Sequence, residues 1–322
     1  MATIFNRAII GMAAILSLFL ANGCIPLTPT PPASGEQQLP VMNDLVRDIE
    51  VAGEPVLFTT PLDATPDPMG ETIYFTALGD QGNGVFSVPA TGGQVSIVAI
   101  GDPLLTPQGL DISSDGTTLY VADSGAGQLF VIHLADSAIM PLSGSENSAP
   151  RGVEVMKENE ADVIYFSGKN PADGQPAIME LSASGGALSV IAAGTPLIDP
   201  VGIAAGSSGA LYVVDRGAAG VGSVLRVENG AVDTIAASVR TGQFPGAALN
   251  LDESALLIST LDAQKDSAQV LVTVLASGEQ VIVNKVIAAN NGAGGLHRAQ
   301  ATNTFAWADS TNSGRVYRVR LP

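Results

Sequence analysis

The chain has 322 residues, of which 31 are Asp or Glu and only 14 are Lys or Arg, so its formal net charge is −17 at pH 7. So few basic side chains cannot neutralise a run of phosphates, which excludes nucleic acid and anionic lipid head groups as charge-driven partners. The chain contains one cysteine, which therefore has no disulfide partner within the chain.

The first 23 residues are typical of an export signal. Arg7 is their only charged residue, and an apolar run extends from Ala8 to Ala21. This run of 14 residues is short for a membrane span. We predict that residues 1–23 form a signal peptide and that the protein is exported.

Cys24 directly follows this signal, and the segment ending there resembles a bacterial lipobox. Ala21 replaces the more common Leu, and Asn22 replaces Ser, Thr or Ala. Lipidation of Cys24 accounts for a lone cysteine in an exported protein, whereas ordinary signal cleavage would leave an idle thiol. The resemblance implies a lipid anchor in the cell envelope. In a Gram-negative host it implies the outer membrane, because Ile25 rather than Asp follows the cysteine.

The segment after Cys24 is a tether by composition. Residues 25–40 are rich in Pro, Thr and Ser and contain little that could pack in a core. We therefore divide the chain into a signal peptide (1–23), a lipidated tether (24–42) and a folded domain (43–322). Signal removal takes away only Arg7, which leaves 13 basic and 31 acidic residues and a charge of −18. The membrane contact is thus expected to come from the lipid.

Six repeats follow, each with an apolar strand, a polar turn and a second apolar strand. The centre of the second strand marks the repeat, and successive markers are 46, 45, 47, 45 and 49 residues apart. This period is typical of a four-stranded propeller blade. The six markers are Tyr74, Tyr120, Tyr165, Tyr212, Leu257 and Ala306.

The unit from Pro107 to Leu142 shows the pattern most clearly. Strands are predicted at 107–112, 119–122, 128–132 and 138–142, with a hairpin turn at Ser114-Asp115-Gly116-Thr117. The Asp-Gly pair supplies the positive backbone angles of a short hairpin, and β-branched and aromatic residues fill the buried strands. Each unit is therefore predicted to be an antiparallel meander.

The sixth unit ends after its third strand, Val316 to Val319, so its sheet lacks one strand. The strand-like segment Leu45 to Val51 precedes the first unit, and we predict that it completes the last blade and closes the ring. The sequence thus predicts an all-β fold, a six-bladed β-propeller of four-stranded antiparallel blades closed by an N-terminal strand. Six markers argue against seven blades.

Two segments, Thr106 to Gly125 and Asp199 to Gly217, resemble the repeats of NHL-repeat and gluconolactonase (regucalcin)-like six-bladed propellers. The resemblance covers Leu45 to Pro322. It implies that ligands bind where the first strands begin, at one end of the central channel. It also implies that enzymes of this kind hold a divalent metal with side chains just before the Gly of each first strand.

The residues at those six positions are Leu62, Gln108, Arg151, Val201, Pro245 and Gly294. None of them is Asp, Glu or Asn, whereas a hard cation needs several oxygen ligands. The resemblance therefore does not carry over a metal site, and we predict no cofactor. Calcium held by other acidic residues remains the alternative.

Other polar residues at this end give the candidate site. Asp123, Asp215 and Asp309 each lie three positions after the marker in the second, fourth and sixth units. They form either an acidic collar that attracts a cation or hydrogen-bond acceptors for their own turns, and the second interpretation is favoured. Asp63 stands where other units have Gly, and His297 lies in a first strand. With Gln108 and Arg151, these residues are the predicted ligand-binding set.

No catalytic residue is predicted. The chain has two histidines and no Gly-x-Ser-x-Gly motif or zinc-binding His pair. We therefore expect a non-catalytic propeller that binds an envelope protein, a peptide or a small molecule. The alternative is a lactonase- or esterase-like hydrolase with a shifted acidic site made of Asp63, Asp123, Asp215 and Asp309.

Overall fold

The computed structural model describes residues 48–262, 267–283 and 292–321. The predicted signal peptide, Cys24 and the tether lie outside these residues. Within them, no helix is long and apolar enough to cross a membrane.

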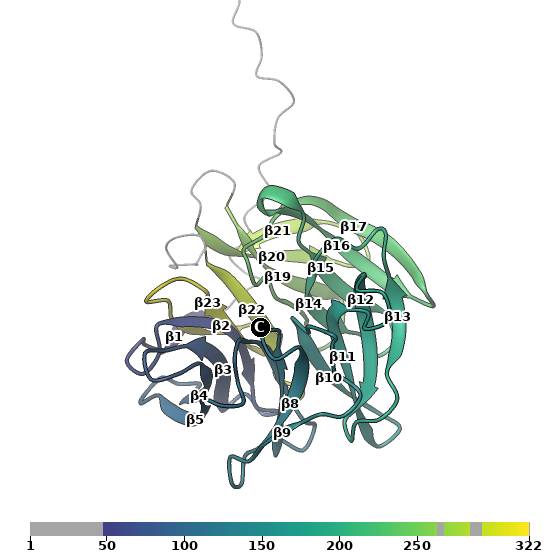
Figure 1. The fold of residues 1–322 in the computed structure, drawn as a ribbon. Helices are drawn as coiled ribbons and strands as arrows, with labels where there is room; N and C mark the ends of the chain where they lie inside the picture. The colour runs from purple at the N-terminus through teal and green to yellow at the C-terminus, as the bar shows by residue number, and fades with distance from the viewer. Residues whose placement is uncertain (1–47, 263–266, 284–291, 322) are drawn as a thin grey trace, which may run out of the picture. The chain divides into compact units, whose positions relative to one another are not determined.

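The described chain forms six four-stranded antiparallel sheets, the blades of a propeller (Figure 1). We number the blades by the order of their inner strands. Blade 1 contains β2 (Thr60–Pro66), β3 (Thr72–Leu78), β4 (Gly84–Pro89) and β5 (Ser96–Ile100). Blade 2 contains β6 (Pro107–Ile112), β7 (Thr118–Asp123), β8 (Gln128–His133) and β9 (Ile139–Pro141). Blade 3 contains β10 (Val153–Glu158), β11 (Ala161–Lys169), β12 (Pro176–Ser182) and β13 (Ser189–Ala193).

The remaining blades follow the same order from the channel outward. Blade 4 contains β14 (Pro200–Ala205), β15 (Leu211–Asp215), β16 (Val221–Glu228) and β17 (Ala231–Arg240), with a 3₁₀ turn η1 (Ala218–Gly220) before β16. Blade 5 contains β18 (Ala247–Leu249), β19 (Ala255–Leu261), β20 (Ala268–Val274) and β21 (Gln280–Val283). Blade 6 contains β22 (Ala293–Arg298), β23 (Thr304–Asp309) and β24 (Val316–Arg320). The predicted fold class is confirmed.

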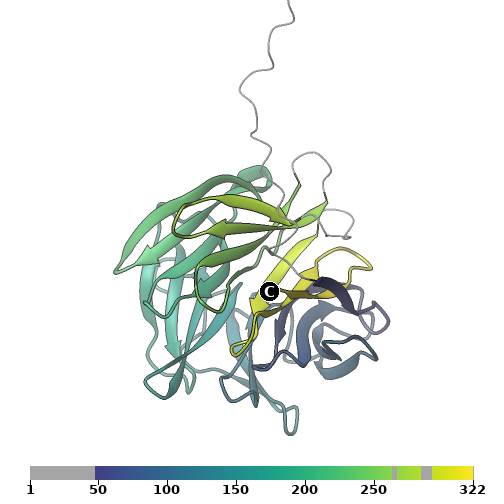
Figure 2. The ribbon, with the colours of Figure 1, turned by 180° about the vertical axis from the view of Figure 1, so that it is seen from behind.

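The fourth strand of blade 6 is β1 (Asp48–Gly53), from the start of the described chain. It pairs antiparallel with β24, and Ile49 lies opposite Val319. Figure 2 shows this N-terminal strand, in purple, beside the yellow C-terminal strands. The predicted closure is confirmed: residues 48–51 of the predicted segment are in this strand, which continues to Gly53, and residues 45–47 lie outside the described residues.

The Asp-Gly hairpin of blade 2 differs in detail from the prediction. Gly116 has a φ of +73°, but Asp115 is not among the residues with positive φ. The Asp115 carboxylate instead accepts a hydrogen bond from the Thr117 backbone N–H at 3.0 Å. The turn therefore has one residue in the left-handed region, Gly116, and is further stabilised by the hydrogen bond to the Asp115 side chain.

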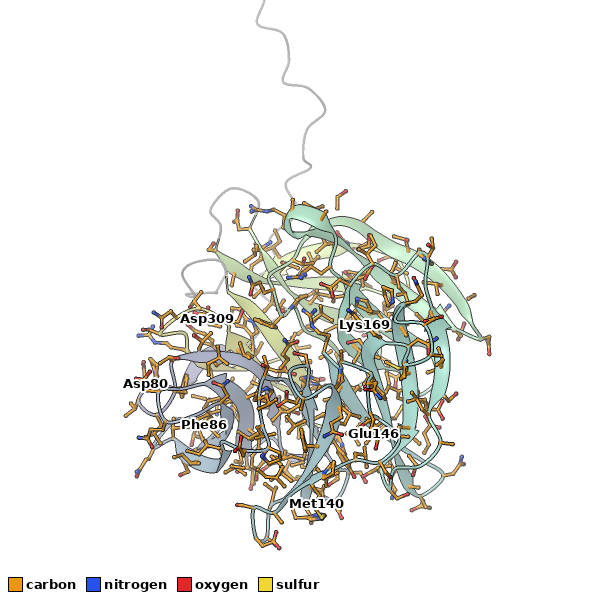
Figure 3. The ribbon with its side chains drawn as sticks, viewed as in Figure 1. Asp80, Phe86, Met140, Glu146, Lys169 and Asp309 are labelled. Carbon is orange, nitrogen blue, oxygen red and sulfur yellow. The ribbon has the colours of Figure 1, made fainter. Side chains whose placement is uncertain are left out.

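Apolar side chains fill the spaces between neighbouring blades. Six buried clusters are found, and each one combines residues of two adjacent blades. Phe86 is buried in the cluster between blades 1 and 6, whereas Met140 on the outermost strand β9 is exposed (Figure 3). Trp307 is fully buried and stacks on Tyr317 at 5.1 Å. These rings belong to the core, so they do not form a sugar-stacking platform.

The inner strands share one irregularity that shapes the channel. In blade 1, blade 2 and blade 4 the pairing register shifts just before the Gly position, so that Leu62, Gln108 and Val201 are bulged out of the ladder. The Gly itself packs on the backbone of the next blade. A Cβ at Gly152 would overlap the carbonyl oxygen of Val201. This close approach explains the Gly at this position in blades 2 to 5.

Candidate functional site

A small pocket, with a cavity volume of about 20 Å³, opens to solvent at the channel end where the inner strands begin. Its polar lining consists of Asp63, Gln108, Arg151 and His297, and its apolar lining includes Phe244. The pocket also contains the residues that directly precede the Gly position in blades 1 to 5, which are Leu62, Gln108, Arg151, Val201 and Pro245. The prediction that ligands enter at this end thus coincides with a pocket in the structure.

Asp63 is the one residue with a side chain in the ring of glycines. Its side chain lies so close to Gly295 that a Cβ atom at position 295 would overlap the Asp63 carboxylate. Its Oδ1 accepts a hydrogen bond from the Ala64 backbone N–H at 2.8 Å, and its Oδ2 accepts one from Leu110 N–H at 3.0 Å. With 4 % of its surface exposed, Asp63 lies at the floor of the pocket.

His297 lies directly beside Asp63 and reaches across the channel. Its Nε2 is 3.1 Å from Asp63 Oδ2, and its Nδ1 is 3.2 Å from Glu154 Oε2. These contacts join blades 6, 1 and 3. Burial would lower the pKa of His297, but the Asp63 carboxylate, its hydrogen bond and the hydrogen bond to Glu154 together raise that pKa well above its ordinary value. Each ring nitrogen of His297 thus lies within hydrogen-bonding distance of a carboxylate oxygen, an arrangement that favours the protonated ring.

A third carboxylate, Asp111, completes the buried cluster. Its Oδ1 accepts a hydrogen bond from Thr65 Oγ1 and its Oδ2 accepts one from Val155 N–H, both at 2.7 Å. Burial and the nearby Glu154 raise the pKa of Asp111 to about 7, although His297 acts in the opposite direction. Glu154 differs from the other members because its side chain is 22 % exposed.

The cluster occupies one layer of the channel, two residues deeper than the glycine ring. Each residue of this layer pairs with the marker residue of its own repeat; Asp111, for example, lies opposite Tyr120, and Glu154 lies opposite Tyr165. The six residues of the layer are Thr65, Asp111, Glu154, Ala204, Ala248 and His297. The polar residues thus come from blades 1, 2, 3 and 6, and small apolar residues from blades 4 and 5.

Asp63 and His297 were predicted from the sequence, whereas Asp111 and Glu154 were not. A signal for both is present in the repeat register. Side chains two residues apart on a strand point to the same face, so the residues two positions beyond the Gly of each inner strand form this layer. The predicted set was drawn mainly from the position before the Gly and from the ends of the second strands.

Arg151 and Gln108 form the polar wall of the pocket. Arg151 donates from Nη1 to Asp199 Oδ1 at 2.9 Å, and Asp199 also accepts from Arg216 Nε at 2.8 Å. Burial lowers the pKa of Arg151, an effect that Asp199 opposes. Arg151 Nε and Gln108 Oε1 are buried and have no hydrogen-bond partner within the described part of the chain. Such a donor and acceptor are costly to bury unless a ligand or water pairs with them.

The predicted collar residues Asp123 and Asp215 are buried outside this pocket and bind local backbone. Asp123 accepts hydrogen bonds from the N–H groups of Leu105, Thr106 and Ala126 at 2.7 to 2.9 Å. The Asp215 Oδ1 accepts one from Asp199 N–H at 2.8 Å. Each carboxylate therefore stabilises the loop that leads into the first strand of its own blade. Asp123 also stabilises the turn that follows it.

Asp309 (labelled in Figure 3) also lies outside the pocket lining. Its Oδ1 accepts a hydrogen bond from Thr311 Oγ1 at 3.0 Å, in the turn that follows β23. Burial raises the pKa of Asp309 to about 6. Blades 1, 3 and 5, which have no Asp at this position, share a different contact. In each of them a hydroxyl group one residue earlier in the second strand donates a hydrogen bond to the carbonyl oxygen of the residue before the Gly position of the next blade. Ser167 Oγ, for example, donates to Val201 O at 2.6 Å.

The residues at the mouth do not fit the metal that the lactonase resemblance implies. The positions before the Gly of each inner strand present apolar side chains, one amide and the Arg151 guanidinium, a donor set that does not suit a calcium ion.

Comparisons with known proteins agree on the fold. No family model and no curated protein matches the sequence. Among solved structures, the chain is similar to a gluconolactonase from Xanthomonas campestris, with 17 % identity, a TM-score of 0.64, and coverage of 88 % of this chain and 97 % of that one. A chain from a nidogen/laminin complex is also similar, with 17 % identity, a TM-score of 0.56, and coverage of 69 % and 78 % respectively.

The protein therefore has a six-bladed propeller fold, as the repeat pattern predicted, and this fold is similar to that of a gluconolactonase, as the sequence resemblance implied. Sequence identity of 17 % establishes this architecture only, and unrelated activities occur on a shared fold.

Proposed function

We propose that this protein is a lactonase- or esterase-like hydrolase of small substrates, with its active site in the pocket at the channel mouth. The observation that carries the proposal is the Asp63 carboxylate at the pocket floor, held by His297. The likeness to a gluconolactonase over 97 % of that chain supports it. From the sequence, the non-catalytic binding module was expected and the hydrolase was the alternative; we now place the hydrolase first.

Asp63 has the environment of a general base. Its Oδ1 accepts the bond from Ala64 N–H, and a carboxylate oxygen can accept a second one. Asp63 would accept a proton from a water molecule, the water oxygen would attack the ester carbonyl carbon, and the bond to the leaving oxygen would break as Asp63 returns the proton to it.

Arg151 and Gln108 are suited to hold the substrate. The unpaired Arg151 Nε–H can donate to the carbonyl oxygen, where negative charge develops as the water attacks. Gln108 Oε1 can accept from a hydroxyl group of the substrate. The apolar wall around Phe244 would contact its carbon skeleton.

The experiment is hydrolysis of a panel of γ-lactones, δ-lactones and aryl esters by the purified protein. Asp63→Asn is expected to lower kcat by about 10²- to 10⁴-fold, the usual contribution of a general base. Arg151→Met should lower kcat by about 10²-fold. Asp80→Asn, at an exposed site away from the pocket, is the matched control and should leave kcat unchanged. Melting curves of each variant separate lost chemistry from lost folding.

The second candidate function is the non-catalytic binding module. The unpaired polar atoms of Gln108 and Arg151 favour ligand binding whether or not a reaction follows. The absence of turnover across the whole panel, together with saturable binding of a hydroxy acid or another small polar ligand that Arg151→Met weakens, would replace the hydrolase with this module.

We also propose that the protein is anchored to the cell envelope by a lipid on Cys24, on the strength of the sequence pattern. Cys24→Ser should release the protein from the membrane fraction or block its processing. The anchor is refuted if the Ser variant is processed and fractionates like the parent, because the acidic domain has no charge-based means of binding a membrane.

A further inference from the structure

The buried layer below the pocket has the arrangement of a metal-binding site. Ligand atoms from Asp111, Glu154 and His297 all lie within 4.8 Å of one another. These residues come from three different inner strands, β6, β10 and β22. Three ligand atoms at this separation can contact one ion in their midst.

We infer that Asp111, Glu154 and His297 bind one divalent transition-metal ion inside the channel. This inference concerns a layer distinct from the bulged positions at the mouth, and it does not rest on the hydrolase proposal.

The orientation of His297 favours this site. Its Nε2 bonds to Asp63, which leaves Nδ1 facing Glu154. Histidine ligands of metals usually donate their second ring N–H to a carboxylate, which fixes the ring and makes the other nitrogen a better ligand. Asp63 fills this supporting role. When a metal binds, the proton on Nδ1 leaves to solvent and the nitrogen lone pair bonds to the metal.

The other two ligands are also suitably placed. Asp111 is held by Thr65 and Val155, and each of its oxygens retains a free lone pair. The exposed fraction of the Glu154 side chain, 22 %, shows that one ligand reaches solvent. An ion therefore has a route into an otherwise buried cluster.

The donor set favours Mn²⁺ or Zn²⁺ over Ca²⁺. Imidazole nitrogen suits transition metals, and carboxylate oxygen is accepted by both of these ions. Calcium takes six to eight oxygen ligands, whereas the cluster offers two carboxylates and one nitrogen.

The test is calorimetric titration of the purified, chelator-treated protein with Mn²⁺, Zn²⁺ and Ca²⁺ in the absence of any substrate. One Mn²⁺ or Zn²⁺ should bind per chain, with weaker binding of Ca²⁺, and the bound ion should raise the melting temperature. Glu154→Gln, at the partly exposed ligand, should weaken binding at least tenfold, and Asp63→Asn by about 10- to 100-fold. Glu146→Gln, which removes an exposed carboxylate elsewhere, should bind like the parent.

Two results would overturn the inference. The first is no stoichiometric binding of Mn²⁺ or Zn²⁺ to the folded parent protein. The second is binding that Glu154→Gln and Asp111→Asn leave as tight as in the parent. Because no substrate is present, neither result bears on whether the pocket hydrolyses esters.

Discussion

Removal of β1 tests how the ring is closed. Five residue pairs join β1 to β24, and at about 1 kcal/mol of net stability for each backbone hydrogen bond their loss costs about 5 kcal/mol. The deletion also exposes the edge of β24 and takes Ala52 from the core between blades 1 and 6. Globular domains have a total stability of about 5–15 kcal/mol, so this one strand accounts for a large share of it.

The assay compares melting temperatures of two truncations. Deletion through Gly53 is expected to lower the melting temperature by about 10–20 °C, at about 2–4 °C for each kcal/mol in a domain of this size. Deletion through Pro40 removes the predicted signal peptide, Cys24 and most of the tether but none of the folded domain, and should leave the melting temperature unchanged. A synthetic peptide of residues 43–54 added to the shorter protein should restore part of the loss, because it can pair with β24.

Equal melting temperatures for the two truncations would refute the closure argument.

Two further predictions concern the aspartates that follow the second strands. Asp123→Ala should destabilise the protein by about 1–3 kcal/mol in urea unfolding, because it leaves the partly buried N–H groups of Leu105 and Thr106 without acceptors. Asp123→Asn, which keeps an acceptor, should cost less, and equal losses would contradict this role. Asp309, with its pKa raised to about 6 from 3.8, binds its proton more tightly in the folded state, so its contribution to stability should fall as the pH rises from about 4 to 6. Asp309→Asn should therefore lose less stability than the parent between pH 4.5 and 7, and identical pH profiles would disprove this assignment.

The architecture was readable from sequence because its determinants are local and repeated. The period of the second-strand markers predicted six blades, and every marker lies opposite the same layer of the channel. The missing strand of the last unit predicted ring closure, since an unpaired sheet edge needs a partner. The Gly of each repeat also marked the close approach of neighbouring blades, as the overlap at Gly152 shows.

The pocket wall was predicted in part. Gln108 and Arg151 were found from the register of the repeats, and both line the pocket. Asp123 and Asp215 shared a register position with each other, but the structure directs them to backbone N–H groups away from it. A shared register specifies a similar place in each blade, and it does not specify which hydrogen bonds the side chain makes there.

Only the tertiary structure decided how the buried cluster is assembled. Asp63 and His297 are 234 residues apart in the chain, and His297 and Glu154 are 143 apart. No local propensity relates residues at such separations. They meet because ring closure brings blades 6, 1 and 3 to one axis, where the glycine ring leaves space for Asp63. In this buried space the carboxylates and the imidazole must neutralise one another, and that mutual dependence follows from the closed ring and not from any single repeat.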